Sequence, residues 1–248
     1  MFERVRIVLV NTSHPGNIGG VARAMKNMGF SRLVLVDPKA FPDEKATARA
    51  SGATEILERA QVVPTLDEAL EGCNYVVGAS ARGRHIPWPV LDPRELASEW
   101  LSGREQLEVA LVFGREDRGL TNEELHRCHK HVHIPADPEF SSLNLAAAVQ
   151  VLCYELRMAV LGQEKGAAPD NRWGTEWDIE LASAEELQRL FEHLERTLVA
   201  IDFLDPDNPR QLMTRLRRLY LRSHPDRVET NILRGILSAT EKLTQPQD

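Results

Sequence analysis

Polar and charged side chains gather in four loops, and each loop follows a run of residues that predicts a buried strand. The loops span residues 11–20, 79–85, 113–120 and 131–144. In an open parallel sheet, ligands bind beside the loops that leave the carboxyl ends of the strands. The spacing is neither that of a dinucleotide fingerprint nor that of a P-loop, so the loops indicate a ligand site of another kind. Glycine-rich turns before helices are common, so a purely structural role for the first loop stays open.

The stretch from His131 to Arg157 joins a strand end, a proline-rich turn and a long apolar helix. Ser141 and Ser142 stand where an N-cap is expected, because a hydroxyl accepts hydrogen bonds from the first free N–H groups of a helix. The following helix is apolar on nearly every side, so we expect it to be buried on more than one face. A capped core helix would explain this pattern. Asn144 in the first turn, and the loop before it, also fit a polar ligand at the helix N-terminus.

Continuous apolar runs alternate with helical patterns in the first two thirds of the chain. The runs Val5–Val10, Leu33–Val36, Tyr75–Ala79 and Val109–Phe113 are typical of parallel strands that are covered on both faces. Residues 1–161 therefore predict one α/β domain, an open parallel sheet of about six strands.

A change of composition predicts the end of this domain. Residues 162–180 lose periodicity and collect glycine, proline and charge, so we interpret them as a linker. Residues 181–248 then predict a small helical extension, with helices near 184–204, 209–222 and 226–243.

Composition limits the classes of function. The 248 residues carry a formal net charge of −7, so any nucleic-acid binding must come from a local basic surface. The three cysteines form no CxxC pair, which predicts reduced, intracellular thiols. We find no run long enough for a signal peptide or a membrane span, so the sequence predicts a soluble, cytoplasmic protein without a membrane partner.

The second predicted helix of the extension supplies a local basic surface. Asn208 is expected to cap it, Pro209 to occupy its first turn, and an apolar stripe to face inward: Leu212, Met213, Leu216, Leu219 and Tyr220. The segment 208–222 holds five arginines and no acidic residue, and three of them share one side: Arg215, Arg218 and Arg222. Such a run is often only a solvated face, but in an acidic chain it favours contact with an RNA backbone.

Histidine and cysteine also cluster between residues 126 and 133. The spacing of His126, Cys128, His129, His131 and His133 fits neither a zinc ribbon nor an HExxH site, so we expect no metal.

Three motifs occur in order along the chain: NIGGVAR at 17–23, FGREDRGL at 113–120, and IP followed by SSLNL within 134–145. Together they resemble the motifs of the SPOUT, or trefoil-knotted, RNA 2′-O-ribose methyltransferases. The resemblance covers almost the whole chain, because TSHPGNIGGVARAMKNMGF, LVFGREDRGLTNEEL and the tail LRRLYLRSHPDRVETNILRGIL are similar to bacterial tRNA enzymes of this family.

The resemblance implies a fold, a cofactor, a partner and a reaction. It implies S-adenosylmethionine bound in a C-terminal trefoil knot of the α/β domain, and a homodimer. It implies methylation of the ribose 2′-hydroxyl of cytidine or uridine at position 32 in the tRNA anticodon loop. The matching positions imply cofactor contacts at Ala79, Ser80, Ala81, Gly114, Ile134, Ser141, Ser142 and Leu143. They imply catalytic roles for Arg23, which the partner subunit supplies, and for Asn17, Glu116, Ser142 and Asn144.

Methyl transfer to a hydroxyl requires alignment, a sink for the hydroxyl proton, and no metal. A guanidinium keeps its proton in proteins, so Arg23 is better suited to clamp a phosphate and stabilise a developing oxyanion than to act as a base. Further RNA contacts are expected from arginines near the cofactor: Arg82, Arg84 and Arg115. The alternatives are a non-catalytic RNA-binding protein of SPOUT type, a 2′-O-methyltransferase for another RNA position, and a flavodoxin-like regulator. The last lacks an acidic phosphoacceptor cluster and leaves the arginine run unexplained.

Overall fold

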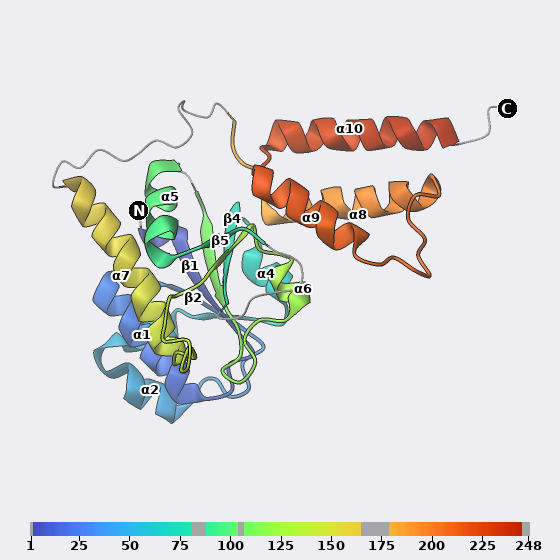
Figure 1. Cartoon of the computed structure of the whole chain (residues 1–248). Coiled ribbons are helices and arrows are strands. Elements are labelled where there is room, and N and C mark those ends of the chain that lie inside the picture. Colours follow the sequence, from blue (N-terminus) through green and yellow to red (C-terminus); the bar gives the residue numbers. More distant parts are fainter. Residues whose placement is uncertain (1, 81–87, 104–106, 165–178, 245–248) are drawn as a thin grey trace.

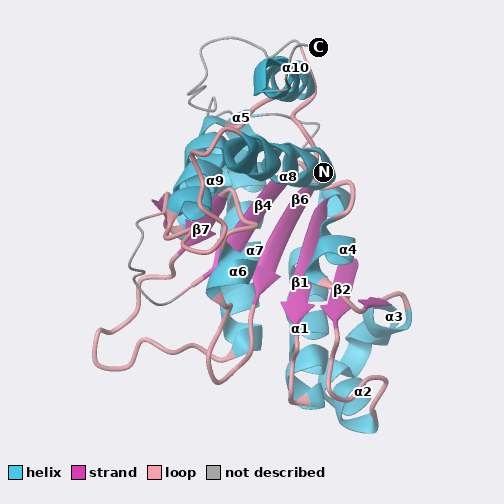
Figure 2. Cartoon of the chain, turned by 90° about the vertical axis from the view of Figure 1, so that its right-hand side faces the viewer, coloured by secondary structure: helices cyan, strands magenta, loops and turns pink. Residues whose placement is uncertain are grey.

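The computed structural model describes residues 2–80, 88–103, 107–164 and 179–244. Within them, seven parallel strands form one sheet in the order β3-β2-β1-β6-β4-β7-β5 (Figure 2). The strands are β1 (Val5–Val10), β2 (Arg32–Val36), β3 (Gln61–Val63), β4 (Tyr75–Ala79), β5 (Val90–Leu91), β6 (Val109–Phe113) and β7 (Lys130–Val132).

The four long apolar runs form β1, β2, β4 and β6, so the predicted α/β class and parallel sheet are confirmed. The prediction of about six strands missed the short ones: β3 has three residues and β5 has two, too few to set up a recognisable pattern. The last strand, β7, lies between β4 and β5, which precede it in the sequence. This order is compatible with the knotted fold that the resemblance implies, and the knot itself stays a prediction.

Helices cover both faces of the sheet, and alternate strand residues serve the two faces. Ile7 and Leu9 pack with α1 (Pro15–Met28), α2 (Glu44–Ala50), α5 (Pro93–Gly103) and α7 (Leu145–Glu164), while Val8 and Val10 pack with α4 (Leu66–Leu70) and α6 (Asn122–Leu125). A short helix, α3 (Thr54–Glu58), follows α2. The helix α1 begins with Pro15 in its first turn and ends at Gly29, whose φ of 84° is a left-handed conformation that suits glycine.

The long apolar helix α7 differs from the prediction in two ways. It begins at Leu145 rather than after Ser141, because the side chain of Asn144 caps it and accepts a hydrogen bond from the N–H of Ala146 at 3.0 Å. It is also not buried on more than one face: Tyr154 is 47% exposed and Met158 is 42% exposed. One side of α7 packs on the sheet and on α1 and α5, and the helix lies at the outer edge of the α/β domain (Figure 1). The other side presents apolar residues to solvent.

The same helix corrects the prediction that no segment approaches a membrane span. The window Leu145–Gly162 is long and apolar enough to cross a membrane, with a mean hydropathy of 1.5. Length and composition alone are weak evidence, because core helices of soluble proteins have the same properties.

The helical extension contains α8 (Ala184–Ala200), α9 (Leu212–Ser223) and α10 (Arg227–Thr244). The helix α9 does not begin at the predicted cap: Asn208 and Pro209 lie in turns, and Gln211 precedes the helix without a side-chain cap. Within the predicted apolar stripe, Leu219 is 44% exposed, and Leu221 is the buried residue of α9.

The extension packs against the amino ends of the strands. The N–H of Ala184 donates to the carbonyl of Cys73, just before β4, and the ring of His224 lies 5.2 Å from that of Tyr75 at the start of β4. Trp88 of the α/β domain joins the apolar cluster of the extension, with Phe191 and Leu221. The arrowheads of the strands accordingly point away from the extension (Figure 2). A domain boundary at 161–181 stays a prediction, because these contacts cross it.

Candidate active site

A cavity of about 280 Å³ lies at the carboxyl ends of β4, β6 and β7. It brings together residues from three separate loops, and they include seven of the eight predicted cofactor contacts: Ala79, Ser80, Gly114, Ile134, Ser141, Ser142 and Leu143. Two contacts join the loops after β4 and β7: the N–H of Ser80 donates to the carbonyl of Val132 at 3.0 Å, and Nδ1 of His133 lies 3.2 Å from the carbonyl oxygen of Ser80. The eighth predicted contact, Ala81, lies outside the described residues.

Gly114 has a different reason to be glycine than the approach of a ligand. A Cβ at this position would lie 2.1 Å from the carbonyl carbon of Gly119, within its own loop. The backbone of residues 115 and 119 forms an isolated bridge, with N–H to oxygen distances of 3.2 and 2.8 Å. Gly114 therefore lets this loop close on itself at the cavity wall.

The carboxylate of Glu116 organises the start of α1. Oε2 accepts hydrogen bonds from the N–H and the hydroxyl of Ser13 at 3.1 and 3.0 Å, and Oε1 accepts from the N–H of His14 at 3.2 Å. The N-cap residue His14 makes no side-chain cap of its own, so Glu116 supplies the acceptors that this helix start lacks.

From Glu116, a relay of side-chain amides crosses to α7. Nδ2 of Asn17 donates to Glu116 at 3.0 Å, and Oδ1 of Asn17 accepts from Nδ2 of Asn144 at 3.0 Å. Because a carboxylate can only accept, it fixes the orientation of the Asn17 amide, which in turn fixes that of Asn144. The structure thus brings together three predicted catalytic residues at the edge of the cavity.

Hydrogen bonds keep Glu116 ionised. Partial burial acts to raise its pKa, but donation from Asn17, Ser13 and His14 outweighs this and lowers the pKa to about 2. An acceptor-only carboxylate at neutral pH suits a positioning role better than proton transfer.

Arg23 lies on α1 but takes no part in this relay. It is exposed, while its neighbours Ala22 and Ala24 are buried. It stands six residues after Asn17, which places it about 9 Å further along the helix and about 240° around its axis. Arg23 therefore points away from the cavity edge that Asn17 faces in the same chain.

The family model of the SpoU rRNA methylases matches residues 4–154, more than half of the chain. The chain belongs to the SpoU methylase family. A second model, the C-terminal domain of the tRNA methyltransferase TrmJ, matches residues 185–248. The predicted resemblance is thereby confirmed, and the chain is an enzyme of the methyltransferase class.

Relatives of TrmJ type match both parts of this SpoU methylase. The chain is 62% identical to the tRNA (cytidine/uridine/adenosine-2'-O-)-methyltransferase TrmJ of Pseudomonas aeruginosa, over 99% of this chain and 96% of that protein. It is 51% identical to the tRNA (cytidine/uridine-2'-O-)-methyltransferase TrmJ of Klebsiella pneumoniae, over 98% of each. The crystal structure of TrmJ from Zymomonas mobilis superposes with a TM-score of 0.81 at 33% identity, over 95% of this chain and 98% of that one.

A structure from work on the 2-OH methylation of C/U34 on tRNA gives an informative contrast. It is 29% identical, with a TM-score of 0.51, and 97% of it corresponds to only 64% of this SpoU methylase. Its length therefore leaves no counterpart for a region as large as the helical extension.

The structure separates the predicted RNA-binding arginines of this SpoU methylase. Arg215, Arg218 and Arg222 share one side of α9, at the amino end of the sheet, with Arg215 and Arg222 exposed and Arg218 half-buried. Arg82 and Arg84 lie outside the described residues. The neighbouring Arg217 lies 4.6 Å over the ring of Phe191 and donates to Gln188, and burial lowers the pKa of its guanidinium.

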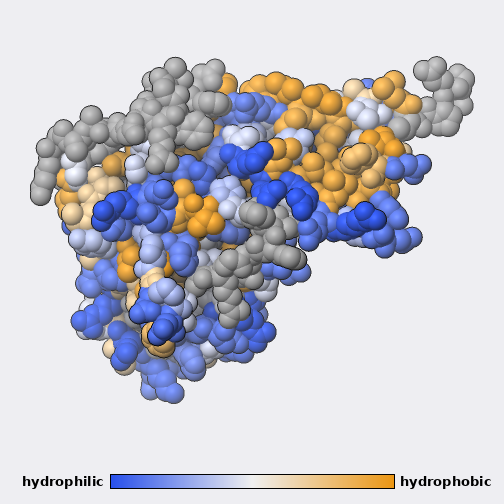
Figure 3. Space-filling view, viewed as in Figure 1, coloured by the Kyte–Doolittle hydropathy of each residue, from blue (hydrophilic) through white to orange (hydrophobic). Residues whose placement is uncertain are grey.

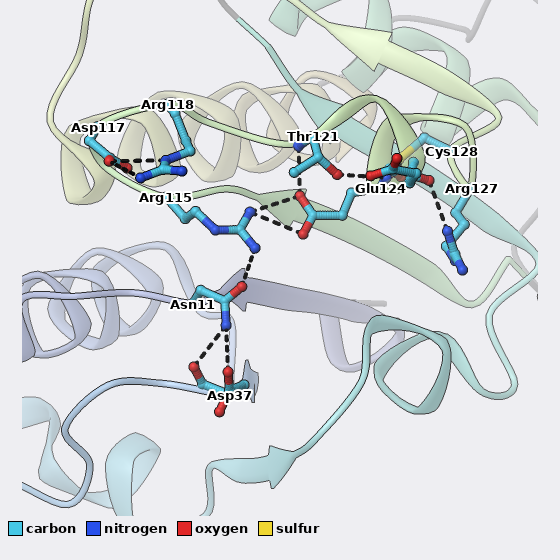
Figure 4. Close-up of polar contacts among 10 residues, drawn as sticks. Asn11, Asp37, Arg115, Asp117, Arg118, Thr121, Glu124, Arg127 and Cys128 are labelled. Carbon is cyan, nitrogen blue, oxygen red and sulfur yellow. Dashed lines mark hydrogen bonds and ion pairs between the residues drawn. The ribbon is translucent and has the colours of Figure 1, made fainter.

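The guanidinium of Arg115 is bonded to other side chains of the protein, and the residue lines the cavity. Its role as an RNA contact stays a prediction. Its guanidinium donates to both oxygens of Glu124 at 3.0 Å and to Oδ1 of Asn11 (Figure 4). Asn11 in turn donates to the carboxylate and the carbonyl of Asp37 at 2.9 and 3.1 Å. The sequence reasoning missed Asn11 and Asp37, although polar residues directly after two apolar strands were a signal that could have found them.

The histidines of the 126–133 cluster have structural partners. The ring of Trp88 stacks on His126 and His131 at 5.4 and 5.5 Å, and Nδ1 of His129 accepts from the N–H of Val76 at 3.0 Å. Among the described residues, no group of three His, Cys, Asp or Glu side chains could hold a metal ion. The three cysteines are buried and form no disulfide, and burial raises the pKa of Cys73 to about 11.

Proposed function

We propose that this SpoU methylase transfers a methyl group from S-adenosylmethionine to the ribose 2′-hydroxyl of cytidine or uridine at position 32 of tRNA. The observation that carries the proposal is the relay of Glu116, Asn17 and Asn144 at the edge of the cavity. It joins all three sequence motifs of the family in one hydrogen-bonded unit. The matches to TrmJ relatives over both parts of the chain support the tRNA substrate.

The cavity suits S-adenosylmethionine in chemistry and in size. The small side chains of Ala79 and Ser80 leave room for a ligand, while Ile134 and Leu143 offer apolar contact for a purine ring. The cofactor, when bound, supplies an electrophilic methyl group on a sulfonium. The hydroxyls of Ser141 and Ser142, which line the same cavity, can hydrogen-bond its polar groups.

The residues of the chain then have distinct tasks. The relay fixes the first turn of α7, and with it the position of Asn144 beside the reacting ribose. Arg23 of the partner subunit would clamp the adjoining phosphate and stabilise negative charge that develops on the 2′-oxygen. The direction of Arg23, away from its own cavity edge, supports this composite site.

A homodimer follows from this composite site. The apolar face of α7, with Tyr154 and Met158, is the surface that we assign to the interface. A contiguous apolar surface on a soluble protein commonly marks such a contact. A tRNA substrate also implies a cytoplasmic protein.

The helical extension distinguishes this SpoU methylase from the solved neighbour for C/U34. The chain of the solved neighbour from work on C/U34 is too short to include such an extension, whereas the TrmJ relatives include it. Its arginines lie at the opposite end of the sheet from the cavity, a distance on the order of 20 Å for strands of five or six residues. We propose that they hold the tRNA backbone and select which nucleotide enters the site.

The direct test is methylation of tRNA transcripts in vitro, with the modified nucleotide located by nuclease digestion and mass spectrometry. The expected result is a 2′-O-methyl group at nucleotide 32, and none when S-adenosylmethionine is omitted. Transcripts with adenosine at 32 test whether this enzyme also methylates adenosine, which the name of its Pseudomonas relative includes. Methylation at another nucleotide would overturn the position. Binding of tRNA and cofactor without transfer would favour the non-catalytic alternative.

A further inference from the structure

Four polar residues next to the active site form a second network, and three of them, Asn11, Asp37 and Glu124, lie outside the three sequence motifs. Arg115 lies between Glu124 of α6 and Asn11 at the end of β1, and Asn11 is bonded to Asp37 at the end of β2 (Figure 4). Arg115 directly precedes Glu116 in the chain. We infer that Arg115, Asn11 and Asp37 are positioning residues for methyl transfer, because they set the place of the Glu116 carboxylate. This inference rests on the proposed function.

Arg115 is fixed on several sides. Its backbone bonds twice to Gly119, and its guanidinium meets both carboxylate oxygens of Glu124. Nη1 makes both contacts to Glu124 while Nη2 donates to Asn11, so the guanidinium is held at two of its nitrogens. Glu124 itself is fixed by the capping box of α6, where it accepts from the N–H of Thr121 at 2.7 Å. The side chains of Arg115 and Glu124 are 22% and 14% exposed, so solvent screens this contact only in part.

Asn11 and Asp37 adopt backbone conformations that indicate constraint. Their φ angles are 49° and 42°, in the left-handed region that asparagine and aspartate tolerate better than other side chains. Both residues are held there by the sheet: the N–H of Asn11 donates to Val36, and that of Asp37 donates to Val63. Residues in such conformations often cluster at functional sites, because the surrounding structure must hold them.

The donor and acceptor groups of the network can pair in only one arrangement. Nδ2 of Asn11 donates to the carboxylate of Asp37, so Oδ1 of Asn11 must face the guanidinium. The network therefore links the ends of β1 and β2 to the loop that carries Glu116, and Glu116 holds the start of α1. A shift of Arg115 would move Glu116, then Asn17 and Asn144, along the wall and edge of the cavity.

The experiment distinguishes two roles of Arg115, that of a positioning residue and that of an RNA contact. For Arg115→Met, the turnover number should fall about tenfold to a hundredfold, the cost of a misplacement near 1 Å. Affinities for S-adenosylmethionine and tRNA should stay at the wild-type values, as should the salt dependence of tRNA binding. Arg127→Met is the matched control, because Arg127 also pairs with a carboxylate, Asp67, but lies away from the cavity.

A charge exchange tests the network itself. Asn11→Asp alone sets two carboxylates side by side and should lower turnover. Asn11→Asp combined with Asp37→Asn restores one amide and one carboxylate, and should recover most of the activity. Asn11→Gly, which suits the left-handed backbone, should keep the fold but lower turnover.

The inference is overturned by any of three results in an active wild-type enzyme. The first is unchanged turnover in Arg115→Met. The second is weaker tRNA binding with a salt slope reduced by about one phosphate contact, as expected of an RNA contact. The third is equal loss of turnover in Arg127→Met, which would indicate general destabilisation. An inactive wild-type enzyme would instead contradict the proposed function.

Discussion

At the scale of the residue, Glu116 acts through other side chains. Its carboxylate holds Ser13 and His14 at the start of α1 and orients Asn17 toward Asn144. Motif spacing in the sequence pointed to Asn17, Glu116 and Asn144. It could not reveal their order in the relay, because that order depends on which oxygen and nitrogen atoms face one another.

Glu116→Gln should therefore impair methyl transfer. An amide places a donor against the donors that surround this position, so the relay loses its orientation. The expected result is a fall in the turnover number of about a hundredfold, with S-adenosylmethionine affinity changed much less. Single-turnover kinetics and calorimetry measure the two effects. Glu123→Gln, at an exposed position of α6, makes the same chemical change and should behave like wild type.

His129 predicts a pH dependence of stability. It is 2% exposed, and burial lowers its pKa to about 4, against about 6.5 in an unfolded chain. The unfolded chain therefore binds a proton first as the pH falls. The contribution of His129 is fully present above pH 6.5 and is lost between pH 6.5 and 4, by up to about 3 kcal/mol.

Urea denaturation at several pH values measures this loss. His129→Asn keeps an acceptor for the N–H of Val76 but removes the titrating ring, so its unfolding free energy should vary less between pH 7 and 5. An equal pH dependence in both proteins would contradict the assignment to His129.

At the scale of the element, the long strands and the existence of the helices could be predicted, but helix starts could not. Ser141 and Asn208 both had suitable cap chemistry, yet α7 begins after Asn144 and α9 after Gln211. Several polar residues compete for each cap, and tertiary contacts decide: Asn144 is held by Asn17. The sequence also could not predict that one side of α7 is exposed in the single chain, because an apolar helix can be buried by its own chain or by a second copy.

The exposed side of α7 leads to a prediction about assembly. Met158→Glu should convert a dimer to a monomer, because it sets a carboxylate in the proposed apolar interface, and methyl transfer should be lost with it. Light scattering after size exclusion measures the mass. Ile232→Glu, on an exposed apolar position of α10, is the matched control and should leave the mass unchanged. A dimeric Met158→Glu protein would place the interface elsewhere.

The arginines of α9 lead to a prediction about tRNA. Replacing Arg215, Arg218 and Arg222 by Ala should weaken tRNA binding and lower the salt slope by about 2 to 3. Filter binding across a salt series measures the slope. Arg49→Ala with Arg59→Ala removes charge elsewhere and should leave the slope as it is. An unchanged slope in the triple variant would mean that this side of α9 is only a solvated face.

At the scale of the whole molecule, the sequence predicted two parts but not how they meet. The extension covers the amino ends of the strands, and the cavity lies at the carboxyl ends (Figure 2). Two buried residues, Trp88 and Tyr75, join the two parts. Aromatic residues of this kind occur in any protein core, so their type alone does not indicate a contact between the parts. Apolar side chains also gather on the outer surface of the extension (Figure 3).

Because Arg23 points away from the cavity edge of its own chain, we expect each active site to be built from two chains. Two inactive variants test it: Arg23→Ala, and Ser141→Trp, whose large side chain fills the cavity. When their subunits are mixed, one site of each mixed dimer combines an intact Arg23 with an intact cavity. If half of the dimers are mixed, methyl transfer should return to roughly a quarter of the wild-type rate. No recovery, with mixed dimers verified by mass spectrometry, would contradict the shared site.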